Sequence, residues 1–196
     1  MSQPFSTAAM QLKDLNDELP VERFTLDWLL KRLGAQSSGL LILVFALLAA
    51  APGVSVPAGV LVLLTAAQMA AGSPRPTFPK WIAERPLPSR SLSAILRRAI
   101  PVLTFIERVV RRRGPAATRA RQRAVGGVVL MLAIRLLTNP LPFSNVVPAL
   151  VIALIALAHI EEDGLLLSVA LAIALLTLWA DIAVLWKVVH QLPLPA

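Results

Sequence analysis

The sequence predicts an all-α integral membrane protein with two proline-broken, re-entrant-like helical hairpin repeats, a basic interfacial helix and a C-terminal transmembrane helix. Three observations favour this class. Hydrophobic residues make up 57% of the chain and charged residues only 15%, against roughly 25% charged residues in average soluble domains. Two apolar stretches are each interrupted by prolines. A third apolar stretch, near the C-terminus, is uninterrupted and long enough to cross a bilayer.

Composition also divides the chain and limits its chemistry. We expect the 196 residues to form one compact unit without a separate catalytic module, and the lack of cysteine excludes disulfides and thiol chemistry. The segments that we distinguish are a polar N-terminal arm with an amphipathic helix (1–38), a first broken repeat (39–72), a basic connection (73–123), a second broken repeat (124–164), a transmembrane helix (165–187) and a tail (188–196).

The N-terminal arm lacks the apolar core of a cleaved signal peptide. Thr25 is a suitable N-cap, and Gly34 a suitable stop, for a helix whose leucines follow helical spacing from Leu26 to Leu33. This helix either lies on the membrane surface with Trp28 near the headgroups, or belongs to a soluble arm that packs on the basic connection.

The two broken stretches share a pattern that indicates an internal repeat. Each has thirteen residues from a glycine to the first proline of its break. The breaks, Pro52–Pro57 and Pro140–Pro148, both end at a proline that alanine follows, where we expect the helix to restart. The next strongly polar residue comes eleven positions later in both stretches, as Gln68 and His159. If the repeats are related, the two breaks should lie next to each other in the fold.

The breaks decide the architecture, because proline removes a backbone donor and disfavours the helical conformation of the residue before it. An arm of thirteen residues spans only ~20 Å as a helix, whereas the hydrocarbon core is ~30 Å thick. We therefore expect half-length helices that meet at a non-helical turn, which is tolerated where protein covers it or water reaches it. Paired interruptions of this kind indicate a transporter-like site. The alternatives are one long kinked helix, or two complete spans joined by a proline-rich loop.

The connection at 73–123 carries thirteen bases and two acids, a net charge of +11, which is typical of the cytoplasmic side of a membrane. Five prolines predict that its first part is extended. The apolar residues of Ser91–Arg113 then predict an interfacial helix, kinked near Pro101, that does not span the membrane. The first explanation of the bases is membrane topology alone, and the second is that they bind lipid phosphates. Aromatic residues are not interleaved with the bases, so no nucleic-acid partner is expected.

Arg135 is the most costly residue of the sequence, because a charge within an apolar arm is expensive and often functional. Its side chain can snorkel to a membrane interface. Alternatively, it can face the break near Asn139, where it contacts no carboxylate of the protein and can bind an anion. We favour the anion-binding role. The remaining role is a structural pair with one of four acids: Glu161, Glu162, Asp163 or Asp181.

His159 precedes an acidic run that ends at Asp163, followed by Gly164. His159 and Asp163 are four residues apart and would share a helix face, a spacing that can bind a metal. Two ligands are a weak signal, so no metal site is predicted. We expect the acids to end the membrane segment and Gly164 to make the turn.

The uninterrupted stretch, Leu165–Trp186, has twenty-two residues and can cross a membrane with some tilt. Trp179 and Trp186 indicate the far interface. Asp181 lies near that end and is expected to be partly exposed, and the proline-rich tail from Pro193 is expected to be unstructured.

Several motifs occur in an order that is informative. The first half contains Pro52-Gly-Val-Ser-Val-Pro57, Gln68-Met-Ala-Ala-Gly72 and Arg75-Pro-Thr-Phe-Pro-Lys-Trp81. The second half contains Pro101 with Glu107-Arg108, then Pro140-Leu-Pro-Phe-Ser-Asn-Val-Val-Pro148 and Glu162-Asp-Gly164. This set resembles the ExoD family of bacterial exopolysaccharide-synthesis membrane proteins, over about residues 25–186. The chain departs from the family at Arg111-Arg-Arg-Gly-Pro115, where a Pro-Arg pair is frequent, and at Thr77-Phe78, where a nearby tryptophan is expected.

The resemblance implies a protein of the bacterial inner membrane that supports exopolysaccharide production, with an associated role in alkaline tolerance. The family offers no catalytic residues to carry over. The sequence contains no evident nucleophile–base pair, phosphate-binding glycine loop or metal set, so we expect neither an enzyme nor a cofactor.

Our first hypothesis is a small transporter or lipid-handling protein, in which the two breaks meet and bind a polar or anionic group, such as that of a lipid-linked sugar phosphate. The alternatives are a non-catalytic scaffold for the polysaccharide-synthesis machinery, and proton or cation passage at 159–163. Expected partners are membrane lipids, and a homo-oligomer is an open alternative to a monomer. The candidate substrate-binding residues are Pro52, Ser55, Pro57, Gln68, Arg135, Asn139, Pro142, Asn145, Pro148, His159, Glu162 and Asp163.

Overall fold

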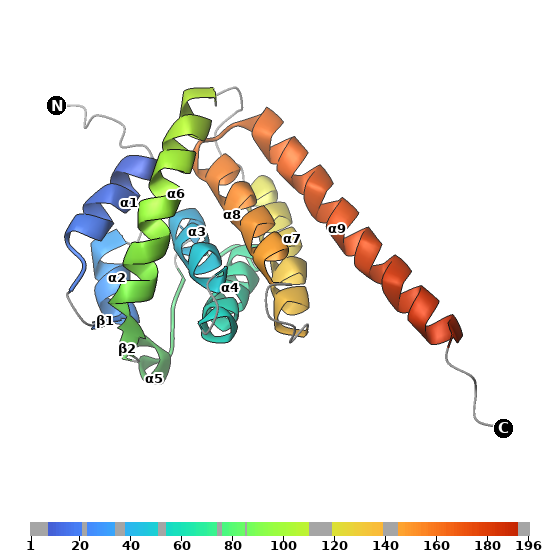
Figure 1. Ribbon diagram of the computed structural model, residues 1–196, viewed down its shortest axis with the longest axis horizontal. Helices are drawn as coiled ribbons and strands as arrows, with labels where there is room; N and C mark the ends of the chain where they lie inside the picture. The colour runs from blue at the N-terminus through green and yellow to red at the C-terminus, as the bar shows by residue number, and fades with distance from the viewer. Residues whose placement is uncertain are drawn as a thin grey trace.

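The computed structural model describes residues 8–20, 23–33, 38–50, 54–73, 76–84, 86–109, 119–138 and 145–191. Within these residues the regular structure is helical apart from one short two-stranded ladder, which confirms the predicted predominance of helices. In chain order the elements are α1 (Ala8–Asp17), β1 (Arg23–Thr25), α2 (Leu26–Leu33), α3 (Ser38–Ala49), α4 (Ser55–Ala70), α5 (Lys80–Ala83), β2 (Pro86–Pro88), α6 (Ser89–Val109), α7 (Arg119–Thr138), α8 (Val146–Ile160) and α9 (Gly164–Gln191) (Figure 1).

Helix α3 lies at the centre of the fold. All 12 of its residues are buried, because α2, α4, α6 and α8 pack around it. A helix that is apolar on every side requires such complete cover. The first arm of the first broken stretch therefore contacts other parts of the protein on all sides.

Each broken stretch forms two separate helices, as the prolines predict. Helix α3 ends at Ala49 and α4 begins at Ser55, while α7 ends at Thr138 and α8 begins at Val146. The apolar helices α3, α4 and α8 have 12, 16 and 15 residues, and all are shorter than the ~20 residues that cross a bilayer. One long kinked helix is therefore excluded for both stretches.

Both second arms begin earlier than expected. We predicted that the helices restart after the prolines, but Pro57 and Pro148 are the third residues of α4 and α8. Proline is accepted there because the first N–H groups of a helix have no acceptor within it. The N-cap residues, Val54 and Asn145, form no capping hydrogen bond through their side chains.

The helices of the two stretches pack crosswise, α3 on α8 and α4 on α7. A Cβ added to Gly39 would lie 3.0 Å from Cγ1 of Ile160, and one added to Gly126 would lie 2.5 Å from the backbone nitrogen of Ala70. Each first arm therefore runs antiparallel to the second arm of the other stretch. We call the end of the bundle that holds these four residues the glycine end, and the opposite end, where the breaks lie, the break end.

The N-terminal arm packs on the basic connection, which was one of our two alternatives. Helix α1 packs on α6, and β1 pairs antiparallel with β2. Thr25 caps α2 as expected, because its Oγ1 accepts the N–H of Trp28 at 3.2 Å. The expected stop, Gly34, lies outside the described residues. Helix α1 was not predicted, since its buried face has only four residues in an otherwise polar arm: Ala8, Ala9, Leu12 and Leu15.

Helix α6 is amphipathic and continues through Pro101. It begins two residues before the expected Ser91–Arg113, the end of which lies outside the described residues. The proline-rich segment before it is not wholly extended, since it contains α5 and β2. One face of α6 buries Leu92, Leu96 and Leu103 against the core. The bases on its other faces are exposed: Arg90, Arg97 and Arg98.

Helix α9 runs along one side of the bundle, with its C-terminal end projecting away from it (Figure 1). Among the described helices it alone is long and apolar enough to cross a membrane, over Gly164–Ala183. Only 17% of this segment is buried. Its exposed side chains include large apolar residues such as Leu176 and Trp179. An open apolar surface of this extent is typical of a site covered by lipid or by another protein.

The turn between α8 and α9 differs from the prediction. Glu162 takes the left-handed conformation, with φ 53°, and Gly164 is instead the first residue of α9. Asp163 caps that helix, because its Oδ1 accepts the N–H groups of Leu165 at 2.8 Å and of Leu166 at 3.1 Å. An aspartate at the N-cap satisfies free donors that a glycine cannot.

Candidate functional site

At the break end, the two broken stretches touch through Ser55 and Asn145. Nδ2 of Asn145 donates a hydrogen bond to Oγ of Ser55 at 3.3 Å. Asn145 is only 9% exposed, and its Oδ1 is buried without a hydrogen-bond partner among the described residues. The breaks are thus adjacent at this contact. Three further candidates at the breaks lie outside the described residues: Pro52, Asn139 and Pro142.

Two helix N-termini meet at the same place. Helix α4 begins at Ser55, and α8 begins directly after Asn145. The first N–H groups of a helix carry the positive end of its dipole and bind anionic or polar groups. Pro57, which is exposed, and Pro148, which is buried, have no N–H, so the donors come from the residues just before them. We call Ser55, Asn145 and these N–H groups the break junction.

The break junction can both donate and accept hydrogen bonds. Its backbone donors can bind a hydroxyl or a phosphate oxygen, and the open Oδ1 of Asn145 can accept a hydrogen bond from a hydroxyl. A buried acceptor without a partner costs about 1–3 kcal/mol. An occupant with hydroxyl groups would offset that cost, so the arrangement suits a sugar or a similar polyhydroxyl group.

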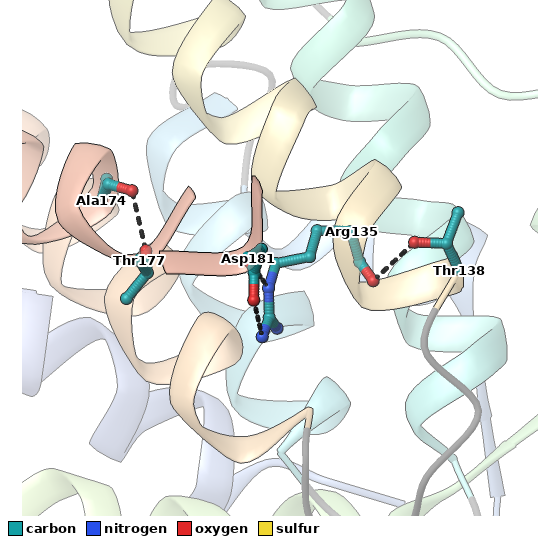
Figure 2. Close-up of polar contacts among 5 residues, drawn as sticks. All are labelled: Arg135, Thr138, Ala174, Thr177 and Asp181. Atoms are coloured by element: carbon teal, nitrogen blue, oxygen red, sulfur yellow. Dashed lines mark hydrogen bonds and ion pairs between the residues drawn. The ribbon is translucent and has the colours of Figure 1, made fainter. Parts of the chain in front are cut away.

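Arg135 is paired with Asp181 across α7 and α9, as Figure 2 shows. Nη2 of Arg135 donates to Oδ1 of Asp181 at 2.8 Å, and Nε donates to Oδ2. The two side chains are 22% and 32% exposed, so Asp181 is partly exposed as expected. The expectation that Arg135 faces the break without a carboxylate is therefore wrong. Pairing neutralises a charge that would be expensive beside so many apolar side chains.

Four candidate residues lie at the glycine end and do not belong to the break junction. Gln68 holds the loop after α4, because its Nε2 donates to the carbonyl of Thr77 at 2.9 Å and its Oε1 accepts the N–H of Thr77 at 2.6 Å. His159, Glu162 and Asp163 lie at the other end of α8 from Asn145. The 15 residues of α8 separate the two ends by ~20 Å. A single site that contains all the candidates is thus excluded.

The acidic turn also lacks the predicted helical geometry. Helix α8 ends at Ile160, so His159 and Asp163 do not share a helix face. Asp163 caps α9, and Oε1 of Glu161 accepts the N–H of Ala8 at 3.3 Å. Within the described ranges, no group of three or more His, Asp or Glu side chains is placed to hold a metal ion.

Comparison with known proteins matches the chain to a protein family and to individual relatives. Residues 8–182 match the model of a family described as "Exopolysaccharide synthesis, ExoD". The chain is 31% identical over 133 residues to Protein ExoD of Rhizobium meliloti (strain 1021), a match that covers 66% of this chain and 55% of that protein. It is 28% identical over 128 residues to the uncharacterized protein slr1875 of Synechocystis sp. (strain ATCC 27184 / PCC 6803 / Kazusa), covering 64% of this chain and 60% of that one.

The chain therefore spans little more than half the length of these relatives. No solved structure matches it.

Proposed function

Because the chain belongs to the ExoD family of exopolysaccharide-synthesis proteins, we propose that it is a membrane protein that supports this synthesis by binding a lipid-linked substrate. The break junction holds the polar or anionic part of that substrate. One observation carries the proposal: two helix N-termini meet beside Asn145, which is buried and has an open acceptor.

The exposed apolar surface supports a place in the membrane. Helix α9 is long enough to cross, and most of its surface is uncovered. Large apolar residues are also exposed on the hairpins near the breaks, among them Ile134, Val56 and Val147. Water is a poor solvent for such a continuous apolar surface, whereas lipid is a good one. The apolar residues that surround the break junction can therefore contact lipid directly.

The helix directions support two hairpins that enter the membrane from one side. The basic connection joins the hairpins at the glycine end, since it follows α4 and precedes α7. Its net positive charge favours a cytoplasmic location for that end. The break junction then lies ~20 Å deep, inside the hydrocarbon core, and α9 crosses to the periplasm. The protein thus resides in the inner membrane.

The same packing supports an internal repeat with parallel orientation. The contact of α3 with α8 has its counterpart in the contact of α7 with α4, and each begins with a glycine, Gly39 or Gly126. Two such repeats would be related by an approximate two-fold axis along the helices. Transporters place substrate sites at the interface of such repeats, and here that interface contains Ser55 and Asn145.

The test is exopolysaccharide output in a strain that lacks the gene and carries Asn145→Ala or Ser55→Ala. Losing one hydrogen bond to the substrate should weaken its binding about tenfold and lower the output while membrane abundance stays normal. Ser168→Ala is the control, because Ser168 is exposed on α9 and, among the described residues, donates its hydrogen bond to the carbonyl of Gly164. Normal output from both junction variants at normal abundance would overturn the proposal.

A scaffold for the synthesis machinery is the second candidate. The exposed bases of α6, Arg90 and Arg97, favour it, because they can bind an acidic partner at the membrane surface. A flux assay on the reconstituted protein with a fluorescent lipid-linked sugar separates the two. Transport predicts flux that Asn145→Ala reduces, whereas a scaffold predicts no flux.

A further inference from the structure

An apolar groove of about 580 Å³ runs between α3, α6 and α8, outside the break junction. Leu43 and Leu47 of α3 form its floor, and the small side chains Ala99 of α6 and Ala153 of α8 leave it open. Its size is within the about 300–1,000 Å³ typical of small-molecule sites. Among the described residues that line the groove, Arg98 is the only one with a polar side chain, so the occupant must be largely apolar.

The groove extends to the break end. Ala50, the last described residue before the first break, lines it, and so does Leu150, in the second turn of α8. Leu157 lines it near the glycine end of the same helix. An elongated apolar chain in the groove would therefore lie along α8 with one end beside the break junction.

Arg98 carries the only charge among the described residues that line the groove. It is exposed, and the described side chains include no carboxylate paired with it. Arg97, the preceding residue, instead lines a separate cleft beside Asn16 and Ser89. The two arginines thus have the same chemistry and lie on different faces of α6.

We propose that this groove binds the hydrocarbon chain of a phosphate-bearing lipid and that Arg98 pairs with its phosphate. The apolar lining matches the chain, and the unpaired guanidinium matches the phosphate, which it can bind through two N–H groups. This inference rests on the proposed function, since the groove provides the site for the lipid part of the substrate.

The test uses the full chain in phosphatidylcholine nanodiscs and a long-chain alkyl phosphate with a diazirine in its chain. Illumination should attach the probe to α3, α6 or α8, and mass spectrometry should locate it there. Arg98→Gln should reduce this labelling about tenfold, as expected for the loss of a charged hydrogen bond. Arg97→Gln, the matched control, should leave it unchanged.

Further probes establish which part of the ligand is recognised. The corresponding long-chain alcohol should label wild type and Arg98→Gln equally, because it lacks the phosphate. Ala99→Phe should reduce labelling by both probes, because it fills the groove. Millimolar inorganic phosphate should not displace the alkyl phosphate, since free phosphate has no chain to bury. Displacement by inorganic phosphate, equal effects of the Arg97 and Arg98 variants, or labelling confined to α9 would each overturn the assignment.

A second copy of the chain is the competing occupant. The protein has no cysteine, so Val102→Cys, exposed beside the groove, introduces a unique thiol. Efficient disulfide-linked dimers through this position would assign the groove to a protein interface and overturn the lipid. The two proposals can fail separately. If Asn145→Ala loses exopolysaccharide output but the lipid probe does not label the groove specifically, only the groove assignment is overturned. If the probe labels the groove specifically but Asn145→Ala has normal exopolysaccharide output, only the substrate-binding role of the break junction is overturned.

Discussion

Arg135 of α7 and Asp181 of α9 are bound edge to edge, with Nη2 of the arginine 2.8 Å from Oδ1 of the aspartate. The pair fastens the exposed C-terminal half of α9 to the second hairpin. Most of the Gly164–Ala183 segment is otherwise uncovered, so the pair adds a specific polar contact to the packing of α9 on α8. The pair also neutralises one charge on each of the two helices.

Arg135→Gln and Asp181→Asn should each destabilise the protein. Either change leaves a charge without its partner, at a loss on the order of 2 kcal/mol, between the values for exposed and buried pairs. We expect lower membrane abundance and a lower melting temperature in detergent for both variants. The exchange Arg135→Asp with Asp181→Arg should recover part of the loss. Normal stability of both single variants would contradict a structural role and return Arg135 to the list of ligands.

The contact between the breaks should be detectable by crosslinking. With cysteines at Ser55 and Asn145, a short bifunctional thiol reagent should link the two positions within one chain, because their side chains are 3.3 Å apart. Cysteines at Gln68 and Asn145 serve as the control, since the length of α4 separates Gln68 from the break end. Equal crosslinking of the two pairs would show that the breaks are not specifically adjacent.

Gly126 should tolerate no side chain. A Cβ there would lie 2.5 Å from the nitrogen of Ala70, and backbone cannot move aside as a flexible side chain can. Gly126→Ala should therefore cost about 1–3 kcal/mol and lower the melting temperature by about 3–10 °C. The neighbouring Gly127 has nothing within 4 Å of the added atom, so Gly127→Ala should be neutral or stabilising by up to about 1 kcal/mol.

The proposed topology predicts that Glu84 and the end of α9 lie on opposite sides of the membrane. Glu84→Cys, at an exposed position, should resist impermeant thiol reagents in intact cells and react after the membrane is opened. Alkaline phosphatase fused after Gln191 should be active, because it folds only in the periplasm. An inactive fusion, or labelling of Glu84→Cys in intact cells, would reverse the assignment.

The sequence predicted the helices of the hairpins well because proline and hydrophobicity act locally. Pro57 and Pro148 predicted the first residues of α4 and α8 to within three residues. Both helices begin earlier than predicted because the first turn of a helix accepts proline. The cap at Thr25 was found for the same reason, since its hydrogen bond reaches only to Trp28. The roles of the membrane and of the candidate ligands stay predictions.

Long-range pairing was less predictable. Asp181 was named among four possible partners of Arg135, but no local pattern selects one acid 46 residues away. The spacing of His159 and Asp163 was misleading because α8 ends between them. Helix α1 was missed since its short buried face packs mainly on α6, which follows it by more than seventy residues.

The crosswise packing of the hairpins has a consequence for biosynthesis. Ser55 and Asn145 are 90 residues apart, and ribosomes add about 5–20 residues each second. For about 5–20 s the first hairpin exists without α7 or α8, the helices that its two arms pack against. Throughout that interval α3, whose residues are all buried in the folded protein, lacks α8, one of the helices with which it packs. Mutations that slow the arrival of the second hairpin should therefore expose the first one to quality-control proteases even when the completed fold is stable.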